Sequence, residues 1–540
     1  MKYKKFMSIL LLQLFIFMLF GFTKVSAAGR EAFNIVTNPG EDMSTSVRVN
    51  WHSDIEDSFL EYTTVDDVEY NNKIVIEPDV RSFSKPANEG GYVSNGFSKR
   101  YVCTAVIDNL EPGTEYMYRV GKTNFSDNYY FKTASDKDFT FVHITDPQYA
   151  DAAGAEVFNT LLGLAYEQDI AFSFFTGDVV DRGGIEEQWS IFFTRSNINK
   201  GVIATGVGNH EYYDASSSPK HYNNGWYNGF HNNPKNGPEE VLNSTYYFTY
   251  NNALFIMIDS ETKVIEPQKE WFAQVCEEHF DKDFIIVGMH RSMYGSIYAS
   301  DSVAVRRNWQ PLFDKYGVDL VLSGHDHIYA RSHSIYKNQI SKDPIYGTTY
   351  IIGGSGGKKY YQANKDPMYA KTITHTSVAN LITITKDEIS LKLIGTAGGV
   401  LDEHVISKKR VGEVDSSFNK ETFKQGITIE QDNNKTGGTL IWPENFYGNV
   451  VQMSIHRSDS TLKTELYLYN KNQTQLRFSG INPTGPSTFI VEVTYLDGTV
   501  DEVEFEIDNT VPYYPTIHEV LEMIRESFNS SVAKIFGKDE

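Results

Sequence analysis

The chain has 540 residues and a formal net charge of −21. This charge excludes a protein that holds nucleic acid by general electrostatic attraction, because such binding depends on lysine and arginine side chains that neutralise phosphates. Hydrophobic residues make up 40% of the chain, charged residues 22% and aromatic residues 14%. At about 150 residues per domain the length predicts roughly three globular domains, and the aromatic content favours strand-rich ones.

The first 27 residues resemble an export signal. Lys2, Lys4 and Lys5 precede an apolar run over residues 6–22, and Ala27 ends a short run of small residues that a signal peptidase requires. We therefore expect cleavage after Ala27 and a secreted, extracellular protein without a stable membrane span. The alternative is an uncleaved anchor, since about 20 apolar residues can span a bilayer. Cleavage would remove four lysines and no acidic residue, so that the net charge of −21 becomes −25.

Residues 31–135 predict an all-β domain. Apolar and polar residues alternate over 44–51 and again over 101–107, as in half-buried strands. Pro112 and Gly113 mark a turn before another strand. Short strands at this spacing favour a β-sandwich of the immunoglobulin or fibronectin type.

Residues 137–410 predict an α/β domain, in which short apolar strands alternate with helical stretches and end in loops that carry Gly, Asp or His. The expected strands are 139–144, 171–175, 201–205, 254–258, 284–287 and 320–322. The expected helices are 155–166 and 267–279. In such layered domains the catalytic groups typically lie on loops at strand ends.

Residues 412–510 predict a further β domain, and residues 511–540 predict a helical tail. Alternation over 489–495, a Leu-Asp-Gly turn and a return over 500–507 indicate a β-hairpin. We expect any association with a cell wall or cell surface to involve this β domain.

The two cysteines, Cys103 and Cys276, fall in different predicted domains. A disulfide between them is therefore not expected, and the sequence has no CxxC motif of the kind that binds zinc or performs redox chemistry. An exported protein without disulfides depends on the size of its core, which three domains can supply.

Five islands of metal-ligand residue types lie in the α/β region, each at or just after the end of a short apolar strand. They are residues 146–148 (DPQ), 177–183 (GDVVDRG), 208–211 (GNHE), 290 (H) and 324–327 (GHDH). Each alone is a weak signal, but five in one order at strand ends are hard to obtain by chance. Two divalent ions about 3.5–4 Å apart need a bridging carboxylate and terminal oxygen and nitrogen ligands, and His and Asp suit Zn, Mn or Fe. The glycines are expected to let the backbone turn sharply.

The order of these islands resembles the calcineurin-like metallophosphoesterases, and most of all the bacterial, secreted members similar to purple acid phosphatases. The segments NLEPGTEYMYRVG, HRSMYGS and YIIGGSGG support that subgroup, over roughly residues 31–410. The resemblance implies a multidomain protein in which a four-layer α/β domain follows the N-terminal sandwich. It also implies an acid phosphatase-like hydrolase that cleaves phosphate monoesters with a metal-activated hydroxide.

The family pattern implies two divalent metal ions (Fe, Mn or Zn) and assigns seven ligands to them. They are Asp146, Gln148 and His327 for one ion, Asn209, His290 and His325 for the other, and Asp178 between the two. His210 matches the position that contacts the phosphate, together with Asn209, and protonates the leaving alcohol.

Two positions depart from the family pattern. Asp181 stands where purple acid phosphatases carry a tyrosinate that binds ferric iron, so we expect two divalent ions and no purple colour. Gln148 stands where many relatives have His, so one ion is expected to be bound more weakly. Alternatively, Gln148 forms hydrogen bonds outside the ligand set. Asp181, Arg182 and Gly183 either support the ligands or form a loop with a salt bridge.

An insertion rich in Asn and Gly follows the third island. Its aromatic and histidine side chains are His221, Tyr222, Trp226, Tyr227, Phe230 and His231. These side chains either gate the substrate or pack a long loop, and packing is favoured.

The leading hypothesis is a secreted phosphatase for small phosphorylated substrates, with no nucleic-acid partner. Three alternatives stay open. The first is a phosphodiesterase or nucleotidase on the same scaffold. The second is a cell-surface binding protein with a non-catalytic phosphoesterase domain, which loss of ligands would indicate. The third is an enzyme that acts on protein or nucleic acid, which the net charge disfavours.

Overall fold

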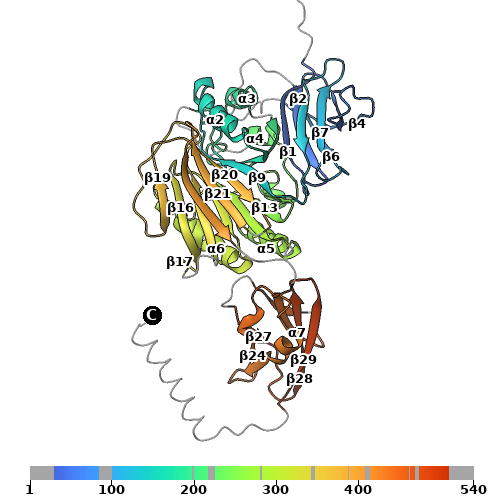
Figure 1. Ribbon diagram of the computed structural model, residues 1–540, viewed down its shortest axis with the longest axis vertical. Helices are drawn as coiled ribbons and strands as arrows, with labels where there is room; N and C mark the ends of the chain where they lie inside the picture. Colours follow the sequence, from blue (N-terminus) through green and yellow to red (C-terminus); the bar gives the residue numbers. More distant parts are fainter. Residues whose placement is uncertain are drawn as a thin grey trace, which may run out of the picture. The chain divides into compact units, whose positions relative to one another are not determined.

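The computed structural model describes most of the chain, in two compact units. The described residues are 30–83, 100–197, 200–216, 225–279, 282–341, 347–386, 388–407, 414–460, 462–468 and 473–509. The expected export signal, the expected helical tail, His221 and Tyr222 lie outside them. The first unit comprises Met1–Asp314 and Val318–Lys408, and the second comprises the rest of the chain (Figure 1).

An N-terminal β-sandwich opens the first unit, as predicted. Its sheets have the orders β1-β2-β6-β5 and β4-β3-β7-β8. The strands are β1 (Phe33–Pro39), β2 (Val47–Ser53), β3 (Phe59–Thr64), β4 (Ile74–Ile76), β5 (Asp79–Phe83), β6 (Arg100–Ile107), β7 (Glu115–Gly121) and β8 (Tyr129–Lys132). Trp51, Leu60 and Tyr118 are fully buried between the sheets. Gly113, with φ of 68°, makes the expected turn before β7.

Two mixed sheets form the centre of the first unit. The first sheet has the order β11-β10-β9-β20-β21-β22, and the second has the order β12-β13-β14-β15-β18-β16-β17, with β19 paired to β16. The strands of the first sheet are β9 (Phe139–Ile144), β10 (Ile170–Phe175), β11 (Val202–Thr205), β20 (Val378–Ile384), β21 (Glu388–Gly395) and β22 (Val400–Ser407). Those of the second are β12 (Tyr246–Tyr250), β13 (Ala253–Ile258), β14 (Phe284–Met289), β15 (Leu320–Ser323), β16 (Tyr329–Tyr336), β17 (Gln339–Ile340), β18 (Thr348–Gly353) and β19 (Tyr369–Ile373). Strands β9 to β11 are parallel to one another, and so are β13, β14, β15 and β18.

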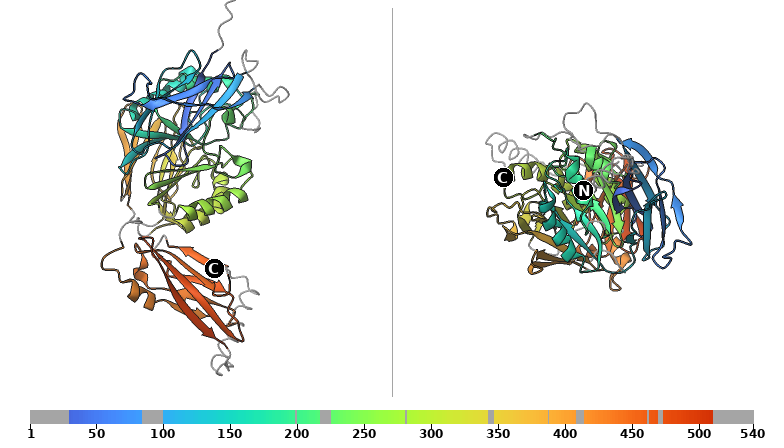
Figure 2. Two further views of the ribbon diagram at one scale, coloured as in Figure 1. Left: turned by 90° about the vertical axis from the view of Figure 1, so that its right-hand side faces the viewer. Right: turned by 90° about the horizontal axis from the view of Figure 1, so that it is seen from above.

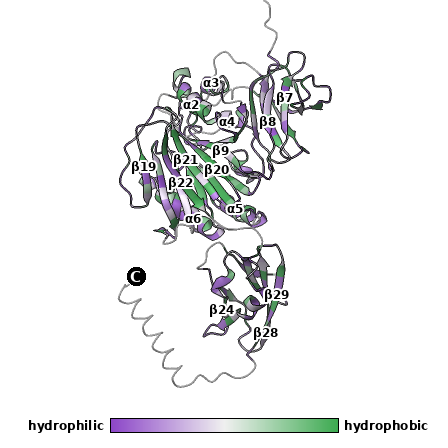
Figure 3. Cartoon of the chain, viewed as in Figure 1, coloured by the Kyte–Doolittle hydropathy of each residue, from purple (hydrophilic) through white to green (hydrophobic). Residues whose placement is uncertain are grey.

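The central strands are apolar on both faces. The two sheets pack against each other and helices cover their outer faces, so that this region has four layers. Phe141 and Phe172 of the first sheet pack edge-on against Phe255 of the second, with ring centroids 5.2 and 5.1 Å away. The outward residues Val142 and Leu254 are also fully buried, because helices cover the outer faces. Figure 3 shows β20 and β21 as largely hydrophobic.

The covering helices were only partly predicted. They are α2 (Ala152–Ala165), α3 (Glu186–Phe193), α5 (Glu266–Glu278) and α6 (Ala299–Tyr316), beside the short α4 (Gly225–Phe230) and η2 (Glu239–Val241). Helices α2 and α5 match the expected ones to within three residues. Asp151 caps α2 by accepting a hydrogen bond from the Gly154 N–H at 2.8 Å. The sequence did not indicate α3, α4 or α6.

Buried polar contacts join the sandwich to the sheets of the first unit. Asn38 Nδ2 donates to the Ile203 carbonyl at 2.8 Å, and His52 Nε2 donates to the Gly229 carbonyl at 2.8 Å. Arg100 of β6 forms a buried ion pair with Glu186 of α3.

The aromatic insertion lies at this same contact. Trp226, Tyr227, Phe230 and His231 are at most 4% exposed, and the Phe230 ring stacks on His52 with centroids 4.7 Å apart. The described part of the insertion therefore packs against the sandwich, as favoured.

The second unit contains the C-terminal β domain. Its sheets have the orders β23-β24-β27 and β26-β25-β28-β29. Its elements are α7 (Lys420–Gln425), β23 (Thr428–Gln431), β24 (Gly437–Ile441), η3 (Glu444–Phe446), β25 (Val450–Arg457), β26 (Lys463–Tyr467), β27 (Gln475–Ser479), β28 (Pro486–Tyr495) and β29 (Val500–Asp508). Strands β28 and β29 form the predicted hairpin (Figure 2).

Two smaller observations complete the fold. Cys103 and Cys276 are both buried and are not joined by a disulfide, as expected. Within the described ranges, none of the helices combines the length and the apolar character that crossing a bilayer requires.

Candidate metal centre

The loops after five parallel strands carry the predicted ligands. Asp146 follows β9, Asp178 follows β10, Asn209 follows β11, His290 follows β14, and His325 and His327 follow β15. Because the carboxyl ends of parallel strands meet at one edge of a sheet, each sheet contributes ligands from one edge, and the two edges face each other.

Two groups of potential metal ligands share one carboxylate. The first consists of Asp178, His290 and His325, and the second consists of Asp146, Asp178 and His327. Within each group the ligand atoms lie within 4.8 Å of one another. A carboxylate common to two groups is what a pair of neighbouring ions needs as a bridge.

Several buried atoms of this cluster have no hydrogen-bond partner among the described residues. They are Asp146 Oδ1, Asn209 Oδ1 and His290 Nε2. His290 Nδ1 donates to the Thr176 carbonyl at 2.9 Å, which leaves Nε2, 3.2 Å from Asp178 Oδ2, as the nitrogen that could bind a metal ion. Buried polar atoms are almost always paired, so this donor set fits metal ions.

The electrostatics of the cluster also favour cations. Burial raises the pKa of the Asp146 carboxyl to about 7, and the nearby Asp178 charge adds to this shift. Burial lowers the pKa of His325 to about 2 and that of His327 to about 3, so both imidazoles are neutral, the form that can bind a metal ion. Burial lowers the pKa of His290, but its interaction with Asp178 acts in the opposite direction and outweighs burial. The pKa of His290 is therefore raised to about 10. A metal ion in place of the proton on His290 would satisfy the same carboxylate.

The backbone at the site is unusual. Positive φ angles occur at Asp146 (52°), Gln148 (38°), Asp178 (51°), His325 (73°) and His327 (48°). Residues other than glycine are uncommon in this region and cluster at functional sites. A Cβ atom at Gly208 would overlap Asp178 Oδ1, and one at Gly324 would overlap Asp146 Oδ2. These two glycines therefore permit a close approach of the carboxylates, whereas the sequence predicted sharp turns.

Glu211 fixes two ligand loops to each other. Its carboxylate is buried and accepts hydrogen bonds from the backbone N–H groups of Asp178 and Gly208 at 2.7 Å each, and from that of Val179 at 2.9 Å. The sequence placed Glu211 in the GNHE island but gave it no role. The sequence feature that could have indicated a role for Glu211 is its position directly after Asn209 and His210, two expected site residues.

His210 lies beside the ligand cluster and is partly exposed. Its backbone N–H donates to Asp178 Oδ1 at 2.9 Å, and its Nδ1 donates to the Asp181 carbonyl at 2.6 Å. This leaves Nε2 as the free ring nitrogen, 3.8 Å from Asp178 Oδ2. The arrangement suits a group that contacts a substrate next to the ions.

Gln148 is engaged by other side chains. Its Oε1 accepts a hydrogen bond from Lys359 Nζ at 3.0 Å, and its Nε2 donates to Asp181 Oδ1 at 3.1 Å. The amide oxygen, the atom that would bind a metal ion, therefore already faces an ammonium group. These contacts favour the alternative in which Gln148 stands outside the ligand set. Arg182 Nε lies 3.6 Å from Asp181 Oδ2, so Asp181 supports Gln148 and also takes part in a loop ion pair.

Two tyrosines that the sequence did not indicate border the cluster. The Tyr298 ring lies 4.2 Å from that of His325, and the Tyr361 ring lies 5.3 Å from that of His327. Their hydroxyl groups are 3.4 Å apart. The loop before Tyr298 is held by Asp326, whose Oδ2 accepts a hydrogen bond from the Ile297 N–H at 2.9 Å.

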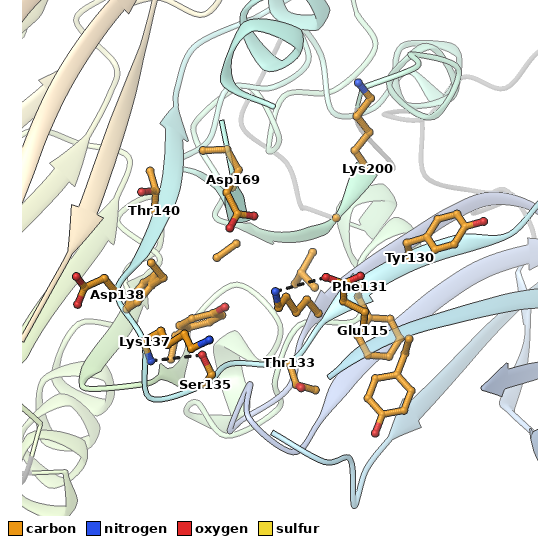
Figure 4. Close-up of a pocket in the computed structure, with 18 of the residues that line it drawn as sticks. Glu115, Tyr130, Phe131, Thr133, Ser135, Lys137, Asp138, Thr140, Asp169 and Lys200 are labelled. Carbon is orange, nitrogen blue, oxygen red and sulfur yellow. Dashed lines mark hydrogen bonds and ion pairs between the residues drawn. The ribbon is translucent and has the colours of Figure 1, made fainter. Parts of the chain in front are cut away.

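A separate pocket of about 380 Å³ lies between β7 and β8 of the sandwich and the amino ends of β9 to β11 (Figure 4). Its lining includes three carboxylates, of Glu115, Asp138 and Asp169, and three lysines, Lys132, Lys137 and Lys200. Lys132 Nζ lies 3.4 Å from Glu115 Oε1. None of the predicted site residues lines it. The pocket is therefore distinct from the metal centre.

Comparison with known families agrees with this geometry. Residues 139–329 match the family described as Calcineurin-like phosphoesterase, and residues 32–133 match the family described as Purple acid Phosphatase, N-terminal domain. Among solved structures, that of purple acid phosphatase PPD1 from yellow lupin (Lupinus luteus) seeds superposes with a TM-score of 0.59. The match covers 70% of this chain and 75% of that one at 21% identity, and supports the fold alone.

The chain covers only part of the length of the curated relatives that it matches. Phosphoenolpyruvate phosphatase of Allium cepa is 25% identical over 310 residues, which are 52% of this chain and 63% of the relative. Purple acid phosphatase 1 of Ipomoea batatas is 27% identical over 318 residues, which are 52% of this chain and 64% of the relative. A further similar protein, an uncharacterized one from Mycobacterium tuberculosis, is matched over 21% of its length at 31% identity. The chain thus spans less than two thirds of each of these relatives.

Proposed function

We propose that this chain, which has a calcineurin-like phosphoesterase domain behind a purple acid phosphatase N-terminal domain, hydrolyses small phosphate monoesters at a dinuclear metal centre. The observation that carries the proposal is the position of Asp178 in both ligand groups. Two divalent ions bound there would acidify a water molecule and neutralise the charge that develops on the phosphoryl group. Asp146 and His327 would hold one ion, and Asn209, His290 and His325 the other.

The protein's own groups would orient the phosphate and supply a proton. His210, which is partly exposed, and the Asn209 amide beside it would contact the phosphoryl oxygens. When both ring nitrogens of His210 carry protons, Nδ1 remains tied to the Asp181 carbonyl and Nε2 can protonate the leaving oxygen. The absence of a tyrosinate at Asp181 supports a pair of divalent ions of the Fe, Mn or Zn type.

Export of the protein belongs to the same proposal. The basic and apolar character of residues 1–27 supports it. The mass of the protein recovered from culture fluid tests it, and a membrane-bound chain that retains residues 1–27 would contradict it.

Metal analysis followed by a phosphatase assay tests the proposed function. The purified protein is expected to bind two divalent ions and to hydrolyse glycerol phosphate. Asp178→Asn is expected to lower kcat/KM at least 10³-fold and to reduce metal content, because both ions lose a charged ligand. Asp138→Asn is the matched control, since Asp138 is exposed at the opposite end of β9 from Asp146. Full metal content and turnover in Asp178→Asn would overturn the shared-carboxylate assignment, and a metal-loaded protein without any hydrolysis would indicate a binding protein.

A further inference from the structure

A glycine-rich loop brings Lys359 to the metal centre. The loop joins β18 to β19, and its backbone runs against the segment that carries Asp146. The Gly356 N–H donates to the Thr145 carbonyl at 2.7 Å. A Cβ atom at Gly357 would overlap the Pro147 carbonyl oxygen, so only glycine permits this approach. The loop therefore holds Lys359 over the Asp146–Gln148 segment.

Lys359 is an exposed cation without an ionic partner. Its Nζ contacts Gln148 Oε1 at 3.0 Å and lies 5.6 Å from the centre of the Tyr361 ring. In the described part of the chain, no carboxylate forms an ion pair with it. An ammonium group has three donors, and here only one of them is used by a neutral oxygen. The remaining donors are free to bind an anion in a charge-assisted hydrogen bond.

The arginines near the centre differ from Lys359 in this respect. Arg291 Nε and Nη2 donate to the two oxygens of Glu261 at 2.8 Å each, and Arg291 also pairs with Asp301. Arg182 pairs with Asp181. Their charges are thus already compensated, whereas the charge of Lys359 is not.

The position of Lys359 indicates which part of a substrate it would meet. Gln148, its hydrogen-bond partner, has Nε2 only 3.2 Å from His210 Nδ1. His210 is the group proposed to protonate the leaving oxygen. Gln148 therefore links Lys359 to His210, the residue proposed to act on the leaving oxygen.

We propose that Lys359 is a specificity-determining residue that binds a second anionic group, a carboxylate or a phosphate, on the leaving part of the substrate. This inference rests on the proposed phosphatase function. In the reaction, water adds to phosphorus, the P–O bond to the leaving part breaks, and His210 returns a proton to that oxygen. The second anionic group stays bound to Lys359 and is not changed.

Two matched substrate pairs test the inference on the full chain loaded with metal. 3-Phosphoglycerate and glycerol 1-phosphate differ by a carboxylate on the leaving part, and inorganic diphosphate and methyl phosphate differ by a phosphate. For Lys359→Gln we expect kcat/KM to fall about tenfold more for the substrate with the second anionic group than for its counterpart without it, in at least one of the two pairs. The pair that responds identifies the anionic group. Lys359→Arg is expected to restore most of the loss.

Lys358→Gln is the control, because it removes the same charge from an exposed neighbour on the same loop. In Lys358→Gln the ratio of kcat/KM between the two members of each substrate pair should be the same as in the wild type. Equal losses of kcat/KM in Lys359→Gln for substrates with and without the second anionic group would overturn the proposal. Lys359 would then brace Gln148 or hold the reacting phosphate. Unchanged ratios in both pairs would overturn the proposal as well.

A binding measurement separates this inference from the proposed function. Phosphonoacetate and ethylphosphonate are not hydrolysed, and they differ by the carboxylate. Calorimetry should show that the wild type prefers phosphonoacetate and that Lys359→Gln loses most of this preference, at unchanged metal content. If the wild type hydrolyses no ester but shows this preference, the phosphatase proposal fails while the anion site stands. If esters are hydrolysed but neither the preference nor the substrate ratios depend on Lys359, the anion site fails alone.

Discussion

At the scale of single residues, the hydrogen bond from His210 Nδ1 to the Asp181 carbonyl leaves one ring nitrogen for chemistry. His210→Ala is therefore expected to slow alkyl phosphates about 10²–10⁴-fold, because an alkoxide needs a proton in order to leave. Nitrophenyl phosphate should lose far less, since a phenolate leaves without one. Initial rates for both substrates, measured beside metal content, check this prediction.

His333→Ala serves as a control, because His333 is an exposed histidine of β16. Equal losses for both substrates with intact metal content would mean that His210 holds the phosphate and does not donate a proton. Equal losses with weaker metal binding would mean that it only braces the turn at Gly208 and Asn209.

Residue type and order were sufficient to predict which side chains meet at the strand ends. Asp146, Asp178 and His290 meet as expected, because a loop at a strand end can point in few directions. The surroundings of Gln148 could not be predicted, because Lys359 is distant in the sequence and approaches only through a close contact between two backbones. The same holds for Tyr298 and Tyr361, whose loops are positioned by hydrogen bonds that no local pattern encodes.

At the scale of elements, the loops after β10 and β11 depend on Glu211. Glu211→Ala would leave the N–H groups of Asp178, Gly208 and Val179 without their acceptor, and each buried donor left unpaired costs about 1–3 kcal/mol. Metal affinity and the unfolding temperature are both expected to fall. Glu211→Gln keeps one acceptor oxygen and should have a smaller effect. Metal titration and thermal unfolding of the two variants measure the difference.

Glu270→Ala is a suitable control for Glu211, because Glu270 is exposed on α5. An effect of Glu211→Ala no larger than that of this control would show that other contacts hold the two loops.

The strands were easier to predict than the helices. Buried parallel strands have apolar side chains on both faces, and runs such as β13 and β14 are visible directly in the sequence. Helix α6 has Pro311 in its interior, which argues against a helix in any local reading. Helix α3 begins after Ile185 without a side-chain cap. These helices form because the outer faces of the sheets must be covered, a condition that a local pattern does not reveal.

At the scale of the whole molecule, His52 makes the contact between the sandwich and the sheets sensitive to acid. Its Nε2 donates to the Gly229 carbonyl, while its Nδ1 accepts from Arg100 Nη1 at 3.0 Å. Burial, together with the Arg100 charge, lowers the pKa of His52 well below its usual value of 6.5. Burial also lowers the pKa of His143 and of His231 to about 3.

A depressed histidine pKa contributes stability that is complete above the unfolded value of about 6.5 and is lost as pH falls toward the folded value. Each such group removes about 1.4 kcal/mol of unfolding free energy per pH unit below 6.5. We therefore expect the stability that His52 contributes, measured as the difference in denaturant midpoint between the wild type and His52→Gln, to be smaller at pH 5.5 than at pH 7. His333→Gln should follow the wild type at both pH values. A difference between the wild type and His52→Gln that is equal at both pH values would contradict this prediction.

The sharing of Asp178 by both ligand groups would also link the two proposed ions thermodynamically. The first ion to bind would order the carboxylate for the second but would also draw on the same negative charge, so the two binding steps would not be independent. By reciprocity, occupancy of either position changes the affinity of the other by the same factor. A metal titration should therefore follow a coupled binding curve, and the two affinities should rise or fall together whenever the protein is altered at Asp178.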